Sequence, residues 1–253
     1  MIGKGSEEMF SPEKIPVKGK VIDITVSISS FTPIFPGDPE PSIEKTLTLE
    51  KDGCAVSRLI FGSHTGTHVD APSHVLKGGL PVDSLDIESL MGEAVVLDFS
   101  RRGGALTGSI LEDVYSKRKV LESSSGVSIL LLKTKAPFQK EEYSETLGFL
   151  AGKSDPRREL EASPESFAYL DASGAAWIVR NGFKTVGIDS FSLDSLSSES
   201  LPAHHTLLSS NVNIVECLDL SSVEAGMYFF LCLPLKIEGC DGAPSRALLI
   251  SYS

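Results

Sequence analysis

All five histidines of this chain lie in two short segments. The first segment, residues 64–74, has the sequence His-Thr-Gly-Thr-His-Val-Asp-Ala-Pro-Ser-His, and the second is the pair His204-His205. The first segment therefore holds three imidazoles and one carboxylate within eleven residues. Histidine and carboxylate side chains form a donor set that borderline divalent metals such as zinc accept in proteins. The types and spacing of these residues indicate a metal-dependent enzyme.

The first segment is not expected to form a regular helix, because its glycine, its proline and its β-branched residues disfavour one. We expect a folded-back loop in which His64, His68 and Asp70 point at a common centre. Three protein ligands leave coordination positions open, which is what a catalytic metal site needs. The alternative is a set of polar loop residues that make ordinary hydrogen bonds. The combination of residue types favours the metal site.

Three further side chains complete the predicted site. His74 is either another ligand or a general acid/base, and we predict the second role because an imidazole pKa of about 6.5 suits proton transfer near neutrality. Glu216 ends an apolar stretch, where a carboxylate is costly unless it binds a metal or a cationic partner, so we predict a metal ligand. We favour His204 over His205, because adjacent side chains point in different directions. Since Asp70 and Glu216 can both bridge, the site could hold one ion or two ions about 3.5 to 4 Å apart.

A mixture of strands and helices must position these residues. Apolar and β-branched runs predict strands over residues 21–26, 43–49, 56–61, 94–99, 127–132, 185–189, 212–216, 229–235 and 247–250. Helical spacing predicts helices over residues 82–91, 166–181 and 206–209. We expect a loose arm at residues 1–19, one domain over residues 20–253 and an exposed charged excursion at residues 138–165. The first histidine segment then begins where a strand ends.

Residues 33–39 form a proline-rich loop, which is a rigid place from which to present side chains because proline fixes φ. Phe35 and Asp38 on this loop are the candidate substrate-binding residues. Two metal dications against two carboxylates would leave the pocket locally positive. We therefore expect a small anionic or zwitterionic substrate.

Charge and composition exclude several classes of protein. The formal net charge of -11 argues against a nucleic-acid surface, which needs clustered Lys and Arg. The content of 41% hydrophobic and 23% charged residues is ordinary for a globular protein. The four cysteines have no CxxC spacing and suit a reducing compartment. Residues 1–20 lack the apolar run of a signal peptide, and no stretch reaches the roughly 20 apolar residues that span a bilayer, so we expect a cytoplasmic protein that does not enter the membrane.

The histidine string of residues 64–74 resembles the signature of the cyclase family, whose members include bacterial kynurenine formamidases and isatin hydrolases. Further segments resemble the family's pattern: Phe-Pro-Gly-Asp at 35–38, Val-Gly-Ile-Asp-Ser at 186–190, Ala-His-His-Thr-Leu-Leu at 203–208, Ile-Val-Glu-Cys-Leu at 214–218 and Gly-Cys-Asp-Gly-Ala-Pro-Ser-Arg at 239–246. The resemblance covers roughly residues 20–253.

The resemblance implies a role for each candidate in the site. A first metal ion would be bound by His64, His68 and Asp70, with Asp70 able to bridge to a second ion. The second position would be completed by His204 and Glu216, and His74 would be the catalytic imidazole. The implied fold is a single α/β domain with a barrel-like core of mixed strands flanked by helices, of the swivelling β/β/α type. The implied assembly is a homodimer or homotetramer. His and carboxylate ligands suit Zn, Mn and Fe alike, and we expect Zn or Mn, as one or two ions.

The resemblance also implies the reaction, which is hydrolysis of a small amide. An arylformamidase of tryptophan catabolism would convert N-formylkynurenine to kynurenine and formate. The alternatives are an isatin hydrolase-like enzyme for another cyclic amide or lactone, and a catalytically inactive metal-binding protein. The chain departs from the formamidase pattern at Phe35, where Trp is frequent, and at Cys217, where Asn or Gly is common. The charged residues 138–165 also lie outside that pattern.

Overall fold

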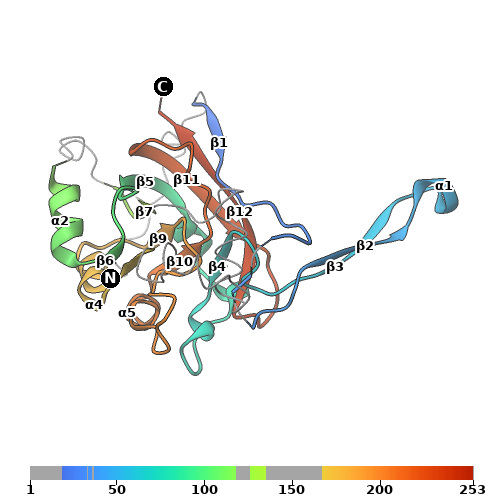
Figure 1. Ribbon diagram of the computed structural model, residues 1–253, viewed down its shortest axis with the longest axis horizontal. Helices are drawn as coiled ribbons and strands as arrows, with labels where there is room; N and C mark the ends of the chain where they lie inside the picture. The colour runs from blue at the N-terminus through green and yellow to red at the C-terminus, as the bar shows by residue number, and fades with distance from the viewer. Residues whose placement is uncertain (1–18, 33, 36, 118–125, 135–166, 253) are drawn as a thin grey trace, which may run out of the picture.

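The computed structural model describes residues 19–32, 34–35, 37–117, 126–134 and 167–252 (Figure 1). Its centre is a sheet of eight strands in the order β1-β12-β11-β5-β7-β9-β10-β4. A further pairing of β4 with β12 closes seven of them into a barrel, and β1 (Val21–Asp23) lies outside this ring along β12. The strands of the ring are β4 (His68–Asp70), β5 (Met91–Asp98), β7 (Ile129–Lys133), β9 (Thr185–Ile188), β10 (Asn213–Glu216), β11 (Gly226–Pro234) and β12 (Gly242–Ser251).

The barrel mixes parallel and antiparallel pairs. Parallel pairs join β5 to β7, β7 to β9 and β9 to β10, whereas β4, β12 and β11 complete the ring through antiparallel pairs. Residues 129–132 of β7 are wholly buried, as expected for a parallel strand that is covered on both faces. The predicted class, a single α/β domain with a barrel-like mixed core, is confirmed.

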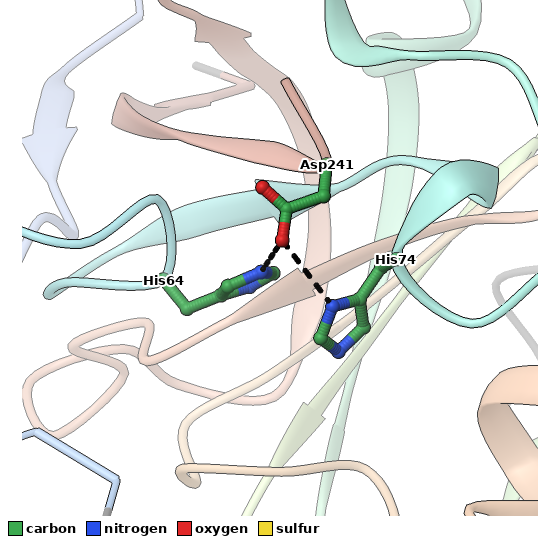
Figure 2. A group of neighbouring side chains, drawn as sticks. All are labelled: His64, His74 and Asp241. Carbon is green, nitrogen blue, oxygen red and sulfur yellow. Dashed lines mark hydrogen bonds and ion pairs between the residues drawn. The ribbon is translucent and has the colours of Figure 1, made fainter. Parts of the chain in front are cut away.

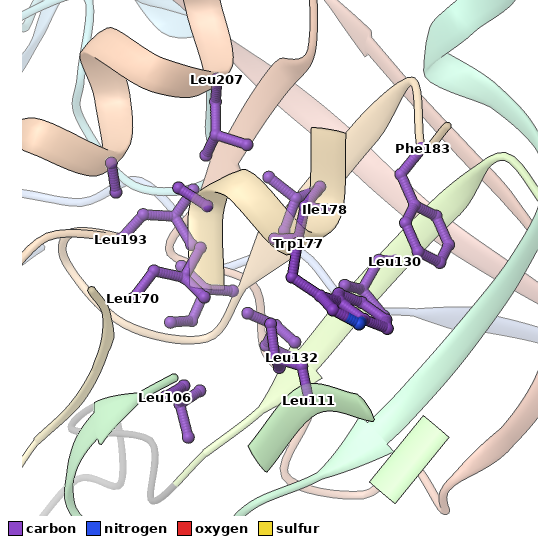
Figure 3. Packing of buried hydrophobic residues seen from close by; sticks show 14 of the residues in the cluster. Leu106, Leu111, Leu130, Leu132, Leu170, Trp177, Ile178, Phe183, Leu193 and Leu207 are labelled. Atoms are coloured by element: carbon purple, nitrogen blue, oxygen red, sulfur yellow. The ribbon is translucent and has the colours of Figure 1, made fainter. Parts of the chain in front are cut away.

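Alternating side chains of the strands fill two apolar layers. Leu130 and Leu132 belong to the layer that packs against three helices (Figure 3). These helices are α2 (Gly108–Ser116), α4 (Ala172–Arg180) and α5 (Pro202–Ser209). Ile129 and Leu131 belong to the second layer, which faces the inside of the ring and includes Phe230. Because successive strand residues point to opposite faces, one strand serves both layers.

Short elements complete the fold. The described residues also contain a small parallel sheet of β6 (Gly104–Leu106) and β8 (Ala168–Leu170) and the 3-10 turns η2 (Pro72–His74), η3 (Val82–Ser84) and η4 (Ile87–Leu90). None of the helices in this part of the chain is both long enough and apolar enough to cross a membrane.

Three predicted helices have other bounds or another form in the structure. The helix predicted over residues 166–181 is β8 followed by α4, because the side chain of Asp171 accepts the N–H of Gly174 and starts the helix there. The helix predicted over residues 82–91 is the pair of turns η3 and η4. The helix predicted at residues 206–209 begins earlier, at Pro202, which suits a first helical turn because it needs no N–H partner. Residues 1–18 of the arm predicted at residues 1–19 lie outside the described residues, as does the excursion at residues 138–165.

A hairpin extends away from the barrel (Figure 1). It consists of β2 (Ser42–Leu47), α1 (Leu49–Asp52) and β3 (Val56–Ile60), and we call it the β2–β3 arm. The strand predicted at residues 43–49 is present, but its apolar side chains are exposed rather than buried. The arm presents Ile43, Leu47, Leu59 and Ile60 to solvent in the single chain.

Candidate metal centre

Strand β4 brings the first histidine segment into the barrel. The sequence predicted a folded-back loop, but His68 to Asp70 form a strand between β10 and β12. Alternation along this strand places the side chains of His68 and Asp70 on the same face. The register with β10 sets Glu216 opposite His68. These three polar side chains are almost completely buried, so their polar atoms need partners.

Asp70 lies at the centre of the cluster. Its Oδ1 atom is 2.8 Å from His64 Nδ1 and 3.3 Å from His68 Nε2. Its Oδ2 atom is 3.3 Å from His204 Nε2 on the other side. The carboxylate of Glu216 spans the same gap, with Oε1 3.2 Å from His204 Nε2 and Oε2 3.6 Å from His68 Nε2. The two oxygens of Asp70 therefore face two separate groups of donors, an arrangement that allows a carboxylate to bridge two ions.

The second nitrogen of each of these three rings is held by an oxygen. His68 Nδ1 lies 2.8 Å from the carbonyl oxygen of Gly66, and His204 Nδ1 lies 2.7 Å from Asp194 Oδ2. His64 Nε2 lies 3.2 Å from Asp241 Oδ2. A ring nitrogen that donates its N–H to such an acceptor leaves the lone pair on the other nitrogen, which is the arrangement of metal-binding histidines.

The polar atoms at the centre fit a cation. Among the described residues, His68 Nε2 and Asp70 Oδ2 are buried without a hydrogen-bond partner. Burial opposes a charged imidazole, but the neighbouring carboxylates, Asp70 before Glu216, outweigh it and hold the pKa of His68 well above its usual value. Burial likewise opposes ionisation of Asp70, yet the neighbouring imidazoles, His204 first, hold the pKa of Asp70 well below its usual value. The lone pairs of these imidazoles and the two carboxylates point at one centre and attract a proton strongly. The same arrangement suits a divalent metal.

His74 lies at the rim of this cluster. It ends the turn η2, and its side chain is partly exposed. Its ring centroid is 4.2 Å from that of His64 and 5.9 Å from that of His204. Burial lowers the pKa of His74, the opposite of the change at His68. A neutral imidazole beside the centre is able to accept a proton near pH 7.

Comparison with known proteins identifies the family of this chain. The family model named Cyclase matches residues 22–195. The chain belongs to the cyclase family. A kynurenine formamidase of Salinibacter ruber is 32% identical over 234 residues, which span 90% of this chain and 96% of that protein.

Two solved structures resemble this cyclase-family chain. One, described as a potential metal-dependent hydrolase with cyclase activity, is 28% identical with a TM-score of 0.67, and the match covers 92% of this chain and 98% of that one. An isatin hydrolase bound to the product analogue thioisatinate is 22% identical with a TM-score of 0.71, and the match covers 92% and 93%. The second likeness concerns the fold alone. The comparisons and the structure thus establish the family, the barrel fold and a cluster of His and Asp side chains that can hold a metal.

The structure brings six of the predicted site residues of this cyclase-family protein into one cluster: His64, His68, Asp70, His74, His204 and Glu216. It separates the two adjacent histidines as expected, since His204 is buried in the cluster and His205 is exposed on α5. Phe35 and Asp38 form a turn in which the N–H of Asp38 donates to the carbonyl of Phe35. Among the described residues, no hydrogen bond or ion pair joins either of them to the cluster, so their contact with substrate stays a prediction.

Two carboxylates of the site were missed from the sequence. Asp194 is buried and accepts the N–H groups of Ala203 and His204 at 2.8 and 3.0 Å, as well as the His204 ring. Asp241 contacts His64. Arg246, five residues after Asp241 in the chain, pairs with Asp23 on β1. Asp194 precedes His204 by ten residues and has no motif of its own, whereas Asp241 lies in the family-like segment 239–246 but reaches His64 across 177 positions of chain.

Proposed function

We propose that this chain is a metal-dependent hydrolase of a small amide, and that it acts as an arylformamidase on N-formylkynurenine. The observation that carries the proposal is the convergence of three imidazoles and two carboxylates on one buried centre, with His74 at its rim. The kynurenine formamidase of Salinibacter ruber, similar along nearly the whole chain, supports the choice of substrate.

The proposed ligands are His64, His68 and Asp70 for a first ion, and Asp70, His204 and Glu216 for a second. When bound, a divalent metal polarises a carbonyl oxygen and lowers the pKa of water toward about 7. Zn and Mn both suit these donors, and one or two ions are compatible with them. The chain's own contribution is to hold each imidazole with its lone pair toward the centre through Gly66, Asp194 and Asp241.

His74 is the proposed acid/base. Hydrolysis of the formamide forms a bond between the water oxygen and the formyl carbon and breaks the bond from that carbon to nitrogen. His74 takes a proton from the attacking water and delivers it to the leaving nitrogen, so that formate and kynurenine are released. Its partly exposed ring at the rim is placed to meet a substrate that enters from solvent.

The charge of the proposed substrate depends on the number of ions. Two carboxylates, Asp70 and Glu216, are proposed metal ligands. Two dications would leave a net positive centre that favours an anionic or zwitterionic substrate, whereas one dication would not. An anionic or zwitterionic substrate is therefore proposed for a site that holds two ions.

The test is hydrolysis of N-formylkynurenine, in parallel with isatin, by protein loaded separately with Zn and Mn. His64→Ala serves as the blank. We expect metal-dependent release of formate that the blank lacks. Turnover of isatin alone would replace the formamidase proposal with ring opening, and tight metal binding without any turnover would favour an inactive binding protein.

A homodimer or homotetramer is also part of the proposal. A two-stranded hairpin is marginally stable by itself in water, and the β2–β3 arm carries exposed apolar side chains on both strands. Packing of the arm on a second copy of the chain would cover them. We expect Ile43→Glu with Leu59→Lys to lower the mass measured by light scattering, and an unchanged mass would contradict a role of the arm in assembly.

A cytoplasmic location is proposed on the four cysteines, none of which forms a disulfide, since free thiols suit a reducing compartment. Location of the tagged full chain in cell fractions checks it.

A further inference from the structure

The segment that carries Asp241 is anchored on both sides. The carbonyl oxygen of Asp241 accepts the N–H of Ala71 at 2.9 Å, and the carbonyl oxygen of Cys240 accepts the N–H of Val82 at 2.8 Å. The next residue, Gly242, begins β12 directly opposite Asp70 in the register with β4. The backbone therefore holds the side chain of Asp241 in a defined place beside the metal ligands.

One oxygen of Asp241 lies between two imidazoles (Figure 2). Asp241 Oδ2 is 3.2 Å from His64 Nε2 and 3.8 Å from His74 Nδ1. The ring of His64 lies close to the backbone of Gly242, where an added Cβ atom would be only 3.0 Å from His64 Cε1. His74 is the less buried of the two rings, and its Nδ1 lies beyond hydrogen-bond range of Asp241 Oδ2. Catalytic hydrogen bonds that are long without substrate often tighten when substrate binds.

Asp241 lies on the far side of His64 from the proposed metal ligands. His64 uses Nδ1 toward Asp70 and Nε2 toward Asp241. The carboxylate of Asp241 therefore holds the His64 ring on the side opposite to Asp70. The same oxygen faces Nδ1 of His74, which leaves the other ring nitrogen of His74 for the proton transfer. This is the relation that a buried carboxylate has to the imidazole in Ser-His-Asp hydrolases.

We propose that Asp241 is the positioning residue for His74: it accepts the Nδ1 proton of His74 and so keeps the lone pair on Nε2, while it holds His64 through the same oxygen. The inference rests on the proposed role of His74 in amide hydrolysis. A rival assignment follows from the same geometry, because His64, His74 and Asp241 offer three donor atoms within 4.8 Å of one another and could hold an ion themselves.

The test compares Asp241→Ala and Asp241→Asn with Asp23→Ala in the zinc-loaded full chain. Asp23 is a matched control, because it is also an ion-paired aspartate and its side chain is 45% exposed against 47% for Asp241. With zinc in excess, we expect Asp241→Ala to keep the zinc content of the wild type, because the proposed ligands themselves remain, and to lower kcat about 10- to 100-fold, the usual effect of losing a carboxylate behind a site imidazole. KM should stay within about twofold. Asn keeps an acceptor oxygen without the charge, so Asp241→Asn should retain more of kcat than Asp241→Ala.

A second readout does not depend on turnover. The chain has five histidines, so ¹⁵N spectra of histidine-labelled protein resolve each ring, and His74→Ala identifies the signals of His74. We expect His74 to carry its proton on Nδ1 in the wild type and in Asp23→Ala, and to show both tautomers in Asp241→Ala.

The possible outcomes separate the alternatives. An unchanged His74 tautomer in Asp241→Ala overturns the proposal, as does a kcat equal to that of Asp23→Ala. Loss of zinc in proportion to activity also overturns it and makes Asp241 a metal ligand. If the wild type releases no formate, the proposed function fails, and the tautomer measurement alone decides the role of Asp241.

Discussion

Replacement of Asp194 by alanine should damage both helix α5 and the metal centre. The carboxylate of Asp194 accepts the N–H groups of Ala203 and His204 and the Nδ1 proton of His204. The residue before α5, Leu201, makes no side-chain cap and has a left-handed backbone with φ of 43°. Asp194 therefore caps the start of this helix from the loop that precedes it, and Leu201 at the N-cap position provides no substitute.

The magnitude follows from these contacts. Loss of a helix cap costs about 1 kcal/mol, and loss of a charge-assisted hydrogen bond inside the protein costs about 2 kcal/mol. We expect Asp194→Ala to lower the free energy of unfolding by about 3 kcal/mol, which for a domain of this size is a drop in Tm of about 6 to 12 °C. Release of the His204 ring should also weaken metal binding about 10- to 100-fold at the position that His204 shares with Glu216.

The assays are thermal unfolding of the metal-free protein and a zinc titration by calorimetry. Asp171→Ala is the matched control, since Asp171 caps α4 through Gly174 but is not hydrogen-bonded to an imidazole of the site. It should lose about 1 kcal/mol and keep its zinc affinity. Equal effects of the two variants on zinc binding would refute the role given to Asp194.

Three other predictions concern the site and its surroundings. His74→Ala should bind metal like the wild type and lose at least about 100-fold in kcat; wild-type turnover by this variant would exclude His74 as the acid/base. Gly242→Ala should weaken zinc binding, because the added Cβ would lie 2.9 Å from the carbonyl oxygen of Val69 and 3.0 Å from the His64 ring. An unchanged zinc-binding isotherm would show that the His64 ring can move aside without loss of affinity. Burial raises the pKa of Asp189 to about 7 although Thr134 donates hydrogen bonds to it. Between about pH 4 and 7 the folded state keeps this proton while the unfolded state releases it, so the stability that is present below pH 4 is lost as pH rises through 7. Asp189→Asn should remove this dependence of stability on pH. At pH 8 the free energy of unfolding of the variant should exceed that of the wild type by up to about 4 kcal/mol. Urea unfolding at about pH 4 and about pH 8 measures it, and the same change with pH in both proteins would contradict the prediction.

Much of the barrel follows from local sequence. Residues 129–132 are four apolar residues in a row, and a strand covered on both faces is the structure that buries all of them. The metal-ligand candidates were also predictable, because the string of residues 64–74 concentrates imidazoles and a carboxylate at short spacing. Helix starts were less predictable. The start of α4 depends on Asp171, and the start of α5 on a carboxylate eight residues before Pro202 in the chain.

The sequence by itself determined which side chains could hold a metal, since donor chemistry belongs to residue type. Only the tertiary structure decided how those donors are aimed. Asp70 becomes the centre because β4 lies between β10 and β12, which sets Glu216 opposite His68 and Gly242 opposite Asp70. Asp194 and Asp241 reach their histidines across 10 and 177 positions of chain. Side-chain periodicity reports which face a residue occupies within its own element, whereas contacts of this kind depend on strand register and loop closure between elements, which no local pattern encodes.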